Sequence, residues 1–75
     1  MTLGDLTAAH RGKVMRLNGE SSVIAGVRHY GVKIGKTDPE VAMTSVIHRS
    51  ASADPTDTYG ETNLPSDTWV EVRGD

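Results

Sequence analysis

The dipeptide Asn18-Gly19 lies between two runs of aliphatic and β-branched residues, and it restricts the fold more than any other feature of the chain. Asparagine and glycine readily take the positive φ angles that a two-residue hairpin turn requires. The pattern therefore predicts a β-hairpin, with one strand over residues 13–17 and the next over residues 22–30. Gly26, inside the second of these strands, predicts a bend or a bulge.

Three more strands are predicted after this hairpin, over residues 31–35, 41–48 and 68–73. In the run over residues 41–48, Val41, Met43 and Ile47 follow the period of two that is typical of one strand face. Residues 50–67 contain no periodic apolar residue, and we expect a long polar loop there.

Residues 1–12 are predicted to form a lead-in to the strands. Thr7 is placed to cap a short helical turn, and Gly12 suits the left-handed conformation that ends such a turn. Because a turn this short is not stable alone, Leu3 and Leu6 are expected to anchor it on the body of the protein.

These elements predict one domain over residues 1–75, mainly β, because a chain of 75 residues is too short for two hydrophobic cores. We expect a small, strongly bent SH3-like barrel of four to five strands with a short N-terminal helical turn. An OB-like barrel and a β-sandwich half that completes itself by dimerising are the alternatives.

The absence of cysteine excludes disulfides, thiolate zinc sites, iron–sulfur clusters and cysteine nucleophiles. We expect no cofactor and no resident metal. No run approaches the roughly 18 apolar residues of a membrane helix, so no membrane partner is expected. The first five residues show no basic segment leading into an apolar one, and we therefore expect a cytoplasmic protein.

The charges are distributed unevenly, although the formal net charge is −2. Residues 11–49 hold seven basic and three acidic residues, whereas residues 50–75 hold six acidic residues and Arg73. This pattern indicates either an anionic partner for the basic part or two halves that attract each other in the folded chain.

The layout of the chain resembles small uncharacterised proteins of phages and prophages from actinobacteria. The resemblance is carried by residues 3–7 and 10–14, by the glycine-centred run 24–27 and by the closing segment 64–72. Such proteins are mostly of unknown function. The resemblance therefore implies a viral setting, in the cytoplasm of a host cell, rather than an activity.

A shorter resemblance, over residues 12–19 and 70–75, is to Sm-like RNA-binding barrels. It implies a bent barrel. The run from Tyr30 to Lys33 departs from the Sm-like pattern, because it lacks the acidic and asparagine-containing loop with which those proteins bind RNA.

The sequence gives little indication of catalysis. His10, His29 and His48 are the candidate general bases, and Ser22 and Ser45 are candidate hydroxyls. Ser45 and His48 are three residues apart on one predicted strand and so point to opposite faces. The chain also lacks a phosphate loop and a nucleophile elbow, and we expect no enzyme and no catalytic residue.

Two binding functions remain. The first is protein–protein interaction or self-assembly, with Trp69 and Tyr59 as candidate contact residues if they are exposed. The alternative interpretation of Trp69 is that it caps the open end of the barrel as part of the core. The second function is nucleic-acid binding, in which basic side chains on adjacent strands and turns line phosphates. The candidates for this role are Arg16, Arg28, Lys33 and Lys36.

Overall fold

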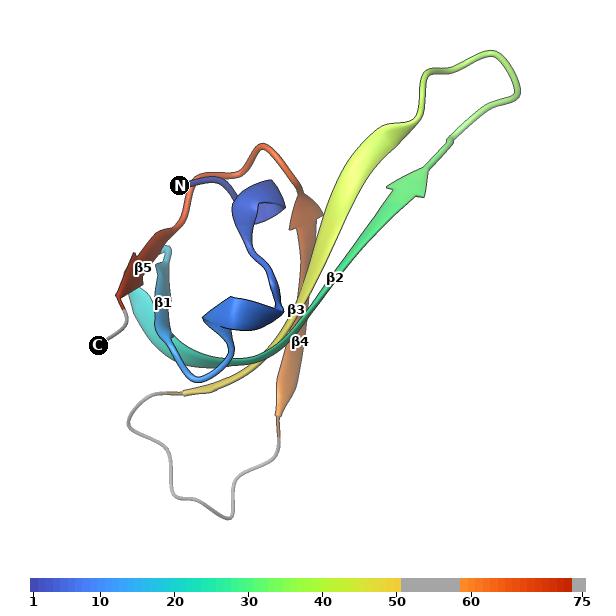
Figure 1. The fold of residues 1–75 in the computed structure, drawn as a ribbon. Helices are drawn as coiled ribbons and strands as arrows, with labels where there is room; N and C mark the ends of the chain where they lie inside the picture. Colours follow the sequence, from blue (N-terminus) through green and yellow to red (C-terminus); the bar gives the residue numbers. More distant parts are fainter. Residues whose placement is uncertain (51–58, 74–75) are drawn as a thin grey trace.

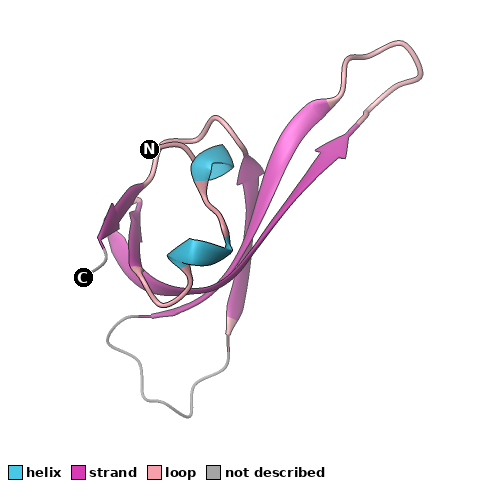
Figure 2. Ribbon diagram, viewed as in Figure 1, coloured by secondary structure: helices cyan, strands magenta, loops and turns pink. Residues whose placement is uncertain are grey.

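The computed structural model describes residues 1–50 and 59–73 of the chain. They form one antiparallel sheet of five strands in the order β4-β3-β2-β1-β5, preceded by two short 3-10 turns (Figures 1 and 2). The elements are η1 (Leu3–Asp5), η2 (Ala8–His10), β1 (Val14–Leu17), β2 (Glu20–Val32), β3 (Val41–Ser50), β4 (Gly60–Pro65) and β5 (Glu71–Arg73). The prediction of a mainly β fold is confirmed.

The hairpin of β1 and β2 forms as predicted. Asn18 and Gly19 take φ angles of 52° and 81°, and β1 pairs with β2 from Val14↔Val23 to Leu17↔Glu20. The register also decides which face of β1 is buried. Met15 is 2% exposed and enters the core, whereas Arg16 points to solvent.

The lead-in packs as the sequence predicts. Thr7 caps η2 by accepting a hydrogen bond from the backbone N–H of Ala9 at 3.3 Å, and Gly12 ends the segment with φ 86°. Leu3 and Leu6 are fully buried. They lie in the core with Met15, Ile24, Val46 and Val70. The N-terminal segment that carries them lies inside the curve of the sheet (Figure 1).

β2 is one long strand, so the prediction of separate strands over 22–30 and 31–35 is wrong. Gly31 and Val32 continue the ladder by pairing with Ala42 and Val41, and the chain turns only between Val32 and Val41. The irregularity predicted at Gly26 is confirmed, because the register of β2 with β3 shifts between Ile24 and Gly26.

β4 lies inside the segment predicted to be a loop over residues 50–67. It pairs with β3 from His48↔Gly60 to Met43↔Pro65, so that part of the prediction is wrong. Residues 51–58 of the expected loop lie outside the described residues. β4 has one exposed face that carries polar side chains. Its sequence therefore lacks the run of apolar residues that would predict a buried strand.

Strand pairing does not close the sheet into a barrel, since β4 and β5 are its two edges. The N-terminal segment instead pairs with the connection between these edge strands. The N–H groups of Leu3 and Gly4 donate to the carbonyls of Thr68 and Ser66 at 2.9 and 2.8 Å, and Thr2 forms a bridge with Trp69. Within the described residues, no helix is long and apolar enough to cross a membrane.

Candidate interaction surfaces

Residues 31–42, here called the arm, form the end of the β2–β3 hairpin and project from the rest of the protein (Figure 1). The remaining described residues are called the body. In the arm, the side chain of Glu40 crosses the backbone at Gly31, where it occupies the space that a Cβ atom would need. Glycine at position 31 therefore allows the two strands of the arm to stay paired beside this side chain.

The apolar side chains of the arm are exposed. Ile34 is 87% exposed, and the cross-strand partners Val32 and Val41 are 38% and 41% exposed. Several exposed apolar side chains on one short element of a soluble domain commonly mark a contact with another molecule. The charges of the arm cancel, because Lys33 and Lys36 are matched by Asp38 and Glu40.

The second surface is the outer face, the side of the sheet that points away from the core. Partners in an antiparallel ladder share a face, and alternate residues along a strand do so too. The pairings give the rows of the outer face along β2, β3 and β4: Gly26–Ile47–Glu61, Arg28–Ser45–Asn63 and Tyr30–Met43–Pro65. The face that Val41, Met43 and Ile47 share, as predicted, is therefore the outer one.

A hydrogen-bond network fixes the polar side chains of this face. Ser45, which is 3% exposed, donates to Oε1 of Glu61 at 2.6 Å, and Asn63 donates to the same oxygen at 3.3 Å. Tyr30 donates to Oδ1 of Asn63 at 2.8 Å. The bonds from Ser45 and Asn63, with a smaller effect of the Arg28 charge, lower the pKa of Glu61 below its usual value.

Arg28 lies over the ring of Tyr30, with its guanidinium carbon 5.3 Å from the ring centroid. This is cation–π distance, and the ring therefore helps to orient the guanidinium group. Beside it, Gly26, Ile47 and Glu61 contribute to a hollow of about 320 Å³.

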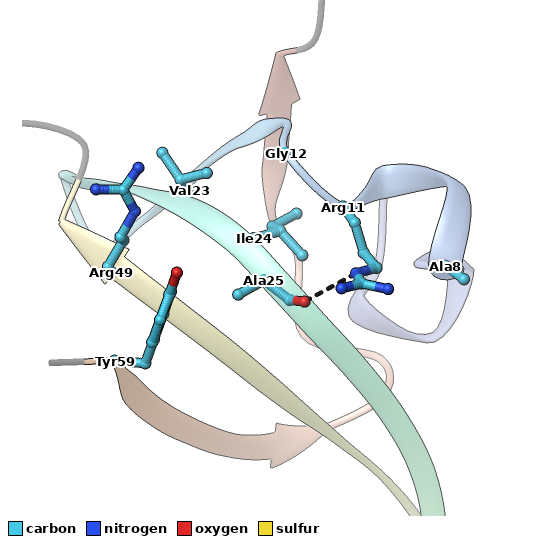
Figure 3. A pocket seen from close by; sticks show the side chains of 8 residues that line it. All are labelled: Ala8, Arg11, Gly12, Val23, Ile24, Ala25, Arg49 and Tyr59. Carbon is cyan, nitrogen blue, oxygen red and sulfur yellow. Dashed lines mark hydrogen bonds between the residues drawn. The ribbon is translucent and has the colours of Figure 1, made fainter. Parts of the chain in front are cut away.

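A larger hollow of about 560 Å³ lies where the other end of the outer face meets the N-terminal segment (Figure 3). Arg49 and Tyr59 lie at one end of it and Arg11 at the other, over a floor that includes Val23 and Ala25. Nε of Arg11 donates to the carbonyl of Ala25 at 3.0 Å, which anchors this side chain. None of the described residues that line this hollow is acidic.

The four basic residues predicted to bind nucleic acid do not form one cluster. Arg28 lies on the outer face near the base of the arm, and Lys33 and Lys36 lie in the turn of the arm. Arg16 lies on β1 opposite Ser21 and Glu71, near the start of β2 rather than its end.

The two candidate protein-contact residues are both exposed. Trp69 is 71% exposed and Tyr59 is 60% exposed. The interpretation of Trp69 as a core residue that caps the barrel is therefore wrong. Val70 and Val72 supply the buried side of this segment instead.

Sequence reasoning did not single out Arg11 and Arg49 as site residues. The sequence signal for Arg49 was the strand period of two. Arg49 follows Ile47 by two residues and therefore lies on the strand face shared by Met43 and Ile47. Its proximity to Tyr59 follows from the pairing of β3 with β4, which ends at His48↔Gly60. Arg49 follows His48 and Tyr59 precedes Gly60, so the two residues come close together.

The three histidines make structural contacts. Nδ1 of His10 accepts from the backbone N–H of Thr7 at 2.9 Å, and Nε2 of His48 lies 2.7 Å from Oγ1 of Thr62. Nε2 of His29 donates to the carbonyl of Leu6 at 2.7 Å. Ser45 bonds to Glu61 on the outer face, so it does not form a dyad with His48. No three His, Asp or Glu side chains gather at a metal-binding distance within residues 1–50 and 59–73.

Comparison of the chain with protein-family models, curated proteins and solved structures finds no match.

Proposed function

We propose that the protein is a non-enzymatic binding module that acts through protein–protein contact, with a partner protein or with further copies of itself. The observation that carries this proposal is the exposure of Ile34, Val32 and Val41 on an arm that projects from the body. Burying such side chains against a partner removes apolar surface from water, which favours association.

The backbone of the arm supports the same role. Gly31 and Val32 pair with β3 on one side, and no ladder of the described residues occupies their other edge, which can add a strand of a partner. The neutral charge balance of the arm fits a protein partner better than a polyanion.

We infer a variant of the small SH3-like barrel, in which the N-terminal segment takes the place of direct pairing between the edge strands. The bonds of Leu3 and Gly4 to the connection between β4 and β5 support it. The resemblance to phage and prophage proteins supports a viral protein that works in the host cytoplasm.

Site-specific photo-crosslinking tests the function. Benzoylphenylalanine is placed at position 34, at the tip of the arm, and in a control protein at Glu20, which is exposed at the opposite end of β2. We expect protein adducts of defined mass from position 34 in the producing cell, and dimer-sized adducts from purified protein if copies associate. Nucleic-acid adducts alone, or no adducts from position 34, would contradict the proposal.

A further inference from the structure

Both tyrosines of the chain lie on the outer face, and each lies near an arginine. Tyr30 and Arg28 are alternate residues on β2, in cation–π contact. Tyr59 continues the alternation of Glu61 and Asn63 at the start of β4, and it lines one hollow together with Arg49 (Figure 3). The sheet therefore presents two Arg–Tyr pairs along one surface.

The cations of these pairs are available to a ligand. In the described residues the one salt bridge joins Arg73 to Glu71, on β5, and neither Arg28 nor Arg49 has a carboxylate within ion-pair distance. Arg11 is held through its Nε atom, which leaves its terminal nitrogens to face the hollow. In the row between the two pairs, Glu61 is the acidic side chain.

We propose that the outer face binds single-stranded nucleic acid, with a base stacked on the exposed ring of Tyr59 and with phosphates contacted by Arg28, which Tyr30 orients, and by Arg49 and Arg11. Aromatic rings on a sheet with nearby arginines supply the stacking and the phosphate contacts that unpaired strands require. A duplex hides the faces of its bases in the stack, so the exposed ring of Tyr59 favours a single strand, whose bases are free to stack on it. This surface is separate from the tip of the arm, and the proposal does not depend on protein binding by Ile34.

The two hollows that border this face fit such a ligand. The larger one has cations at its two ends and apolar side chains in its floor, which suits an elongated ligand with charged groups on either side of a flat one. An acidic peptide would satisfy the cations but would leave the exposed ring of Tyr59 without a stacking partner.

The test is fluorescence anisotropy of a labelled oligothymidylate of roughly 12 nucleotides, titrated with the full-length protein between about 50 and 200 mM salt. The RNA counterpart and a duplex of equal length are run in parallel. We expect binding to the single strands at low salt, weaker binding to the duplex, and an affinity that falls as salt rises.

Three variants separate phosphate contacts from stacking. Arg28→Ala and Arg49→Ala should each reduce the slope of log K against log salt by about 0.7, which is the contribution of one phosphate in a single strand. Tyr59→Leu should weaken binding by about tenfold and leave the slope unchanged, because stacking releases no counterions. Arg73→Ala is the matched control, since it removes a positive charge that Glu71 already pairs.

Glu61→Gln gives a readout that a structural role would not produce. Glutamine keeps an oxygen that can accept from Ser45, but it removes the negative charge between the two Arg–Tyr pairs. Affinity should rise by about twofold to fivefold at low salt. Glu71→Gln, which removes an acidic charge on β5, should leave the affinity within about twofold of that of the wild type. Circular dichroism confirms that each variant is folded.

Three results would overturn the proposal. The first is no binding of any single strand at low salt. The second is an equal loss of affinity in Arg73→Ala and Arg49→Ala, which would show diffuse charge rather than a defined face. The third is tighter binding of a polyglutamate peptide of matched charge than of the oligonucleotide, which would assign the face to an acidic protein.

Discussion

The body and the arm use the same kinds of residue in opposite ways. In the body, Leu6, Ile24 and Val46 are at most 1% exposed and pack inside the curved sheet. In the arm, Val32, Ile34 and Val41 are exposed on a ribbon that extends beyond the core (Figure 1). Residues of similar hydrophobicity therefore stabilise the fold in one region and stay in contact with water in the other.

The reason is geometric. The body curves around the N-terminal segment, which supplies Leu3 and Leu6 as a second layer over the sheet. The described residues provide no such layer over the arm, whose apolar side chains belong to neither the core cluster nor the residues packed against it. Substitutions in the arm are therefore expected to leave the stability of the core unchanged.

The largest effect is expected from a core substitution. Leu6→Ala should lower the free energy of unfolding by about 2 to 5 kcal/mol, because it empties a fully buried site. Ile34→Ala should change it by less than about 0.5 kcal/mol. Urea unfolding followed by far-ultraviolet circular dichroism measures both. Equal losses in the two variants would show that the arm is part of the core.

A smaller loss is expected from the part-buried chain of hydrogen bonds that links the lead-in to β3. Thr44 is fully buried, and its Oγ1 lies 2.9 Å from Nδ1 of His29 and 2.8 Å from Oγ of Ser66. Thr44→Val removes both bonds and leaves two polar groups without this partner. Unfolding free energy should fall by about 1 to 3 kcal/mol. The conservative variant Thr44→Ser should restore most of the loss.

The pH dependence of the outer face is set by Glu61. Because hydrogen bonds from Ser45 and Asn63 lower its pKa in the folded state, its contribution to stability is present above the ordinary value of 4.5 and is lost as pH falls through the lower folded value. Carbon-detected NMR titration should give a pKa below 4.5 in the wild type and a higher pKa in Ser45→Ala.

Asp5 is the internal control for that titration. Its pKa is lowered by hydrogen bonds from the backbone and side chain of Thr2, on a different part of the body. It should not respond to Ser45→Ala. A Glu61 pKa that also stays constant in this variant would show that the Ser45 bond does not hold the carboxylate.

The smallest effect is expected at Trp69, which is exposed although it belongs to the body. Its backbone bridges to Thr2, whereas its side chain is 71% exposed. Trp69→Ser should therefore alter the unfolding free energy by less than about 0.5 kcal/mol. Iodide should quench the fluorescence of the wild-type tryptophan efficiently. A shielded tryptophan would place this side chain in the core after all.

Local signals in the sequence predicted the parts of the fold that local chemistry controls. Asn18-Gly19 forms the turn between β1 and β2, Gly12 takes its positive φ, and Leu3 and Leu6 are buried. β4 was not predicted, because its exposed face carries Glu61 and Asn63 and its end carries Pro65. An edge strand of this kind has the composition of a loop.

The candidate sites were harder to predict, because they depend on register. The sequence pattern predicted a boundary between two strands at Gly31, yet the pairing of β2 with β3 continues past this residue and produces the arm. Arg49 and Tyr59 are separated by residues 50–58, and only the pairing of β3 with β4 brings them to one hollow. Arg28 and Tyr30 are the exception, since their spacing of two predicts a shared strand face.

The most direct test of the central claim is to remove the arm. In the shortened protein an Asn-Gly turn joins Tyr30 to Met43, which are cross-strand partners, in place of residues 31–42. We expect the body to fold with an unfolding free energy within about 1 kcal/mol of the wild-type value, and no longer to co-purify with the proteins that crosslink to position 34 of the full-length chain. A shortened protein that does not fold, or that keeps those contacts, would contradict the separation of body and arm.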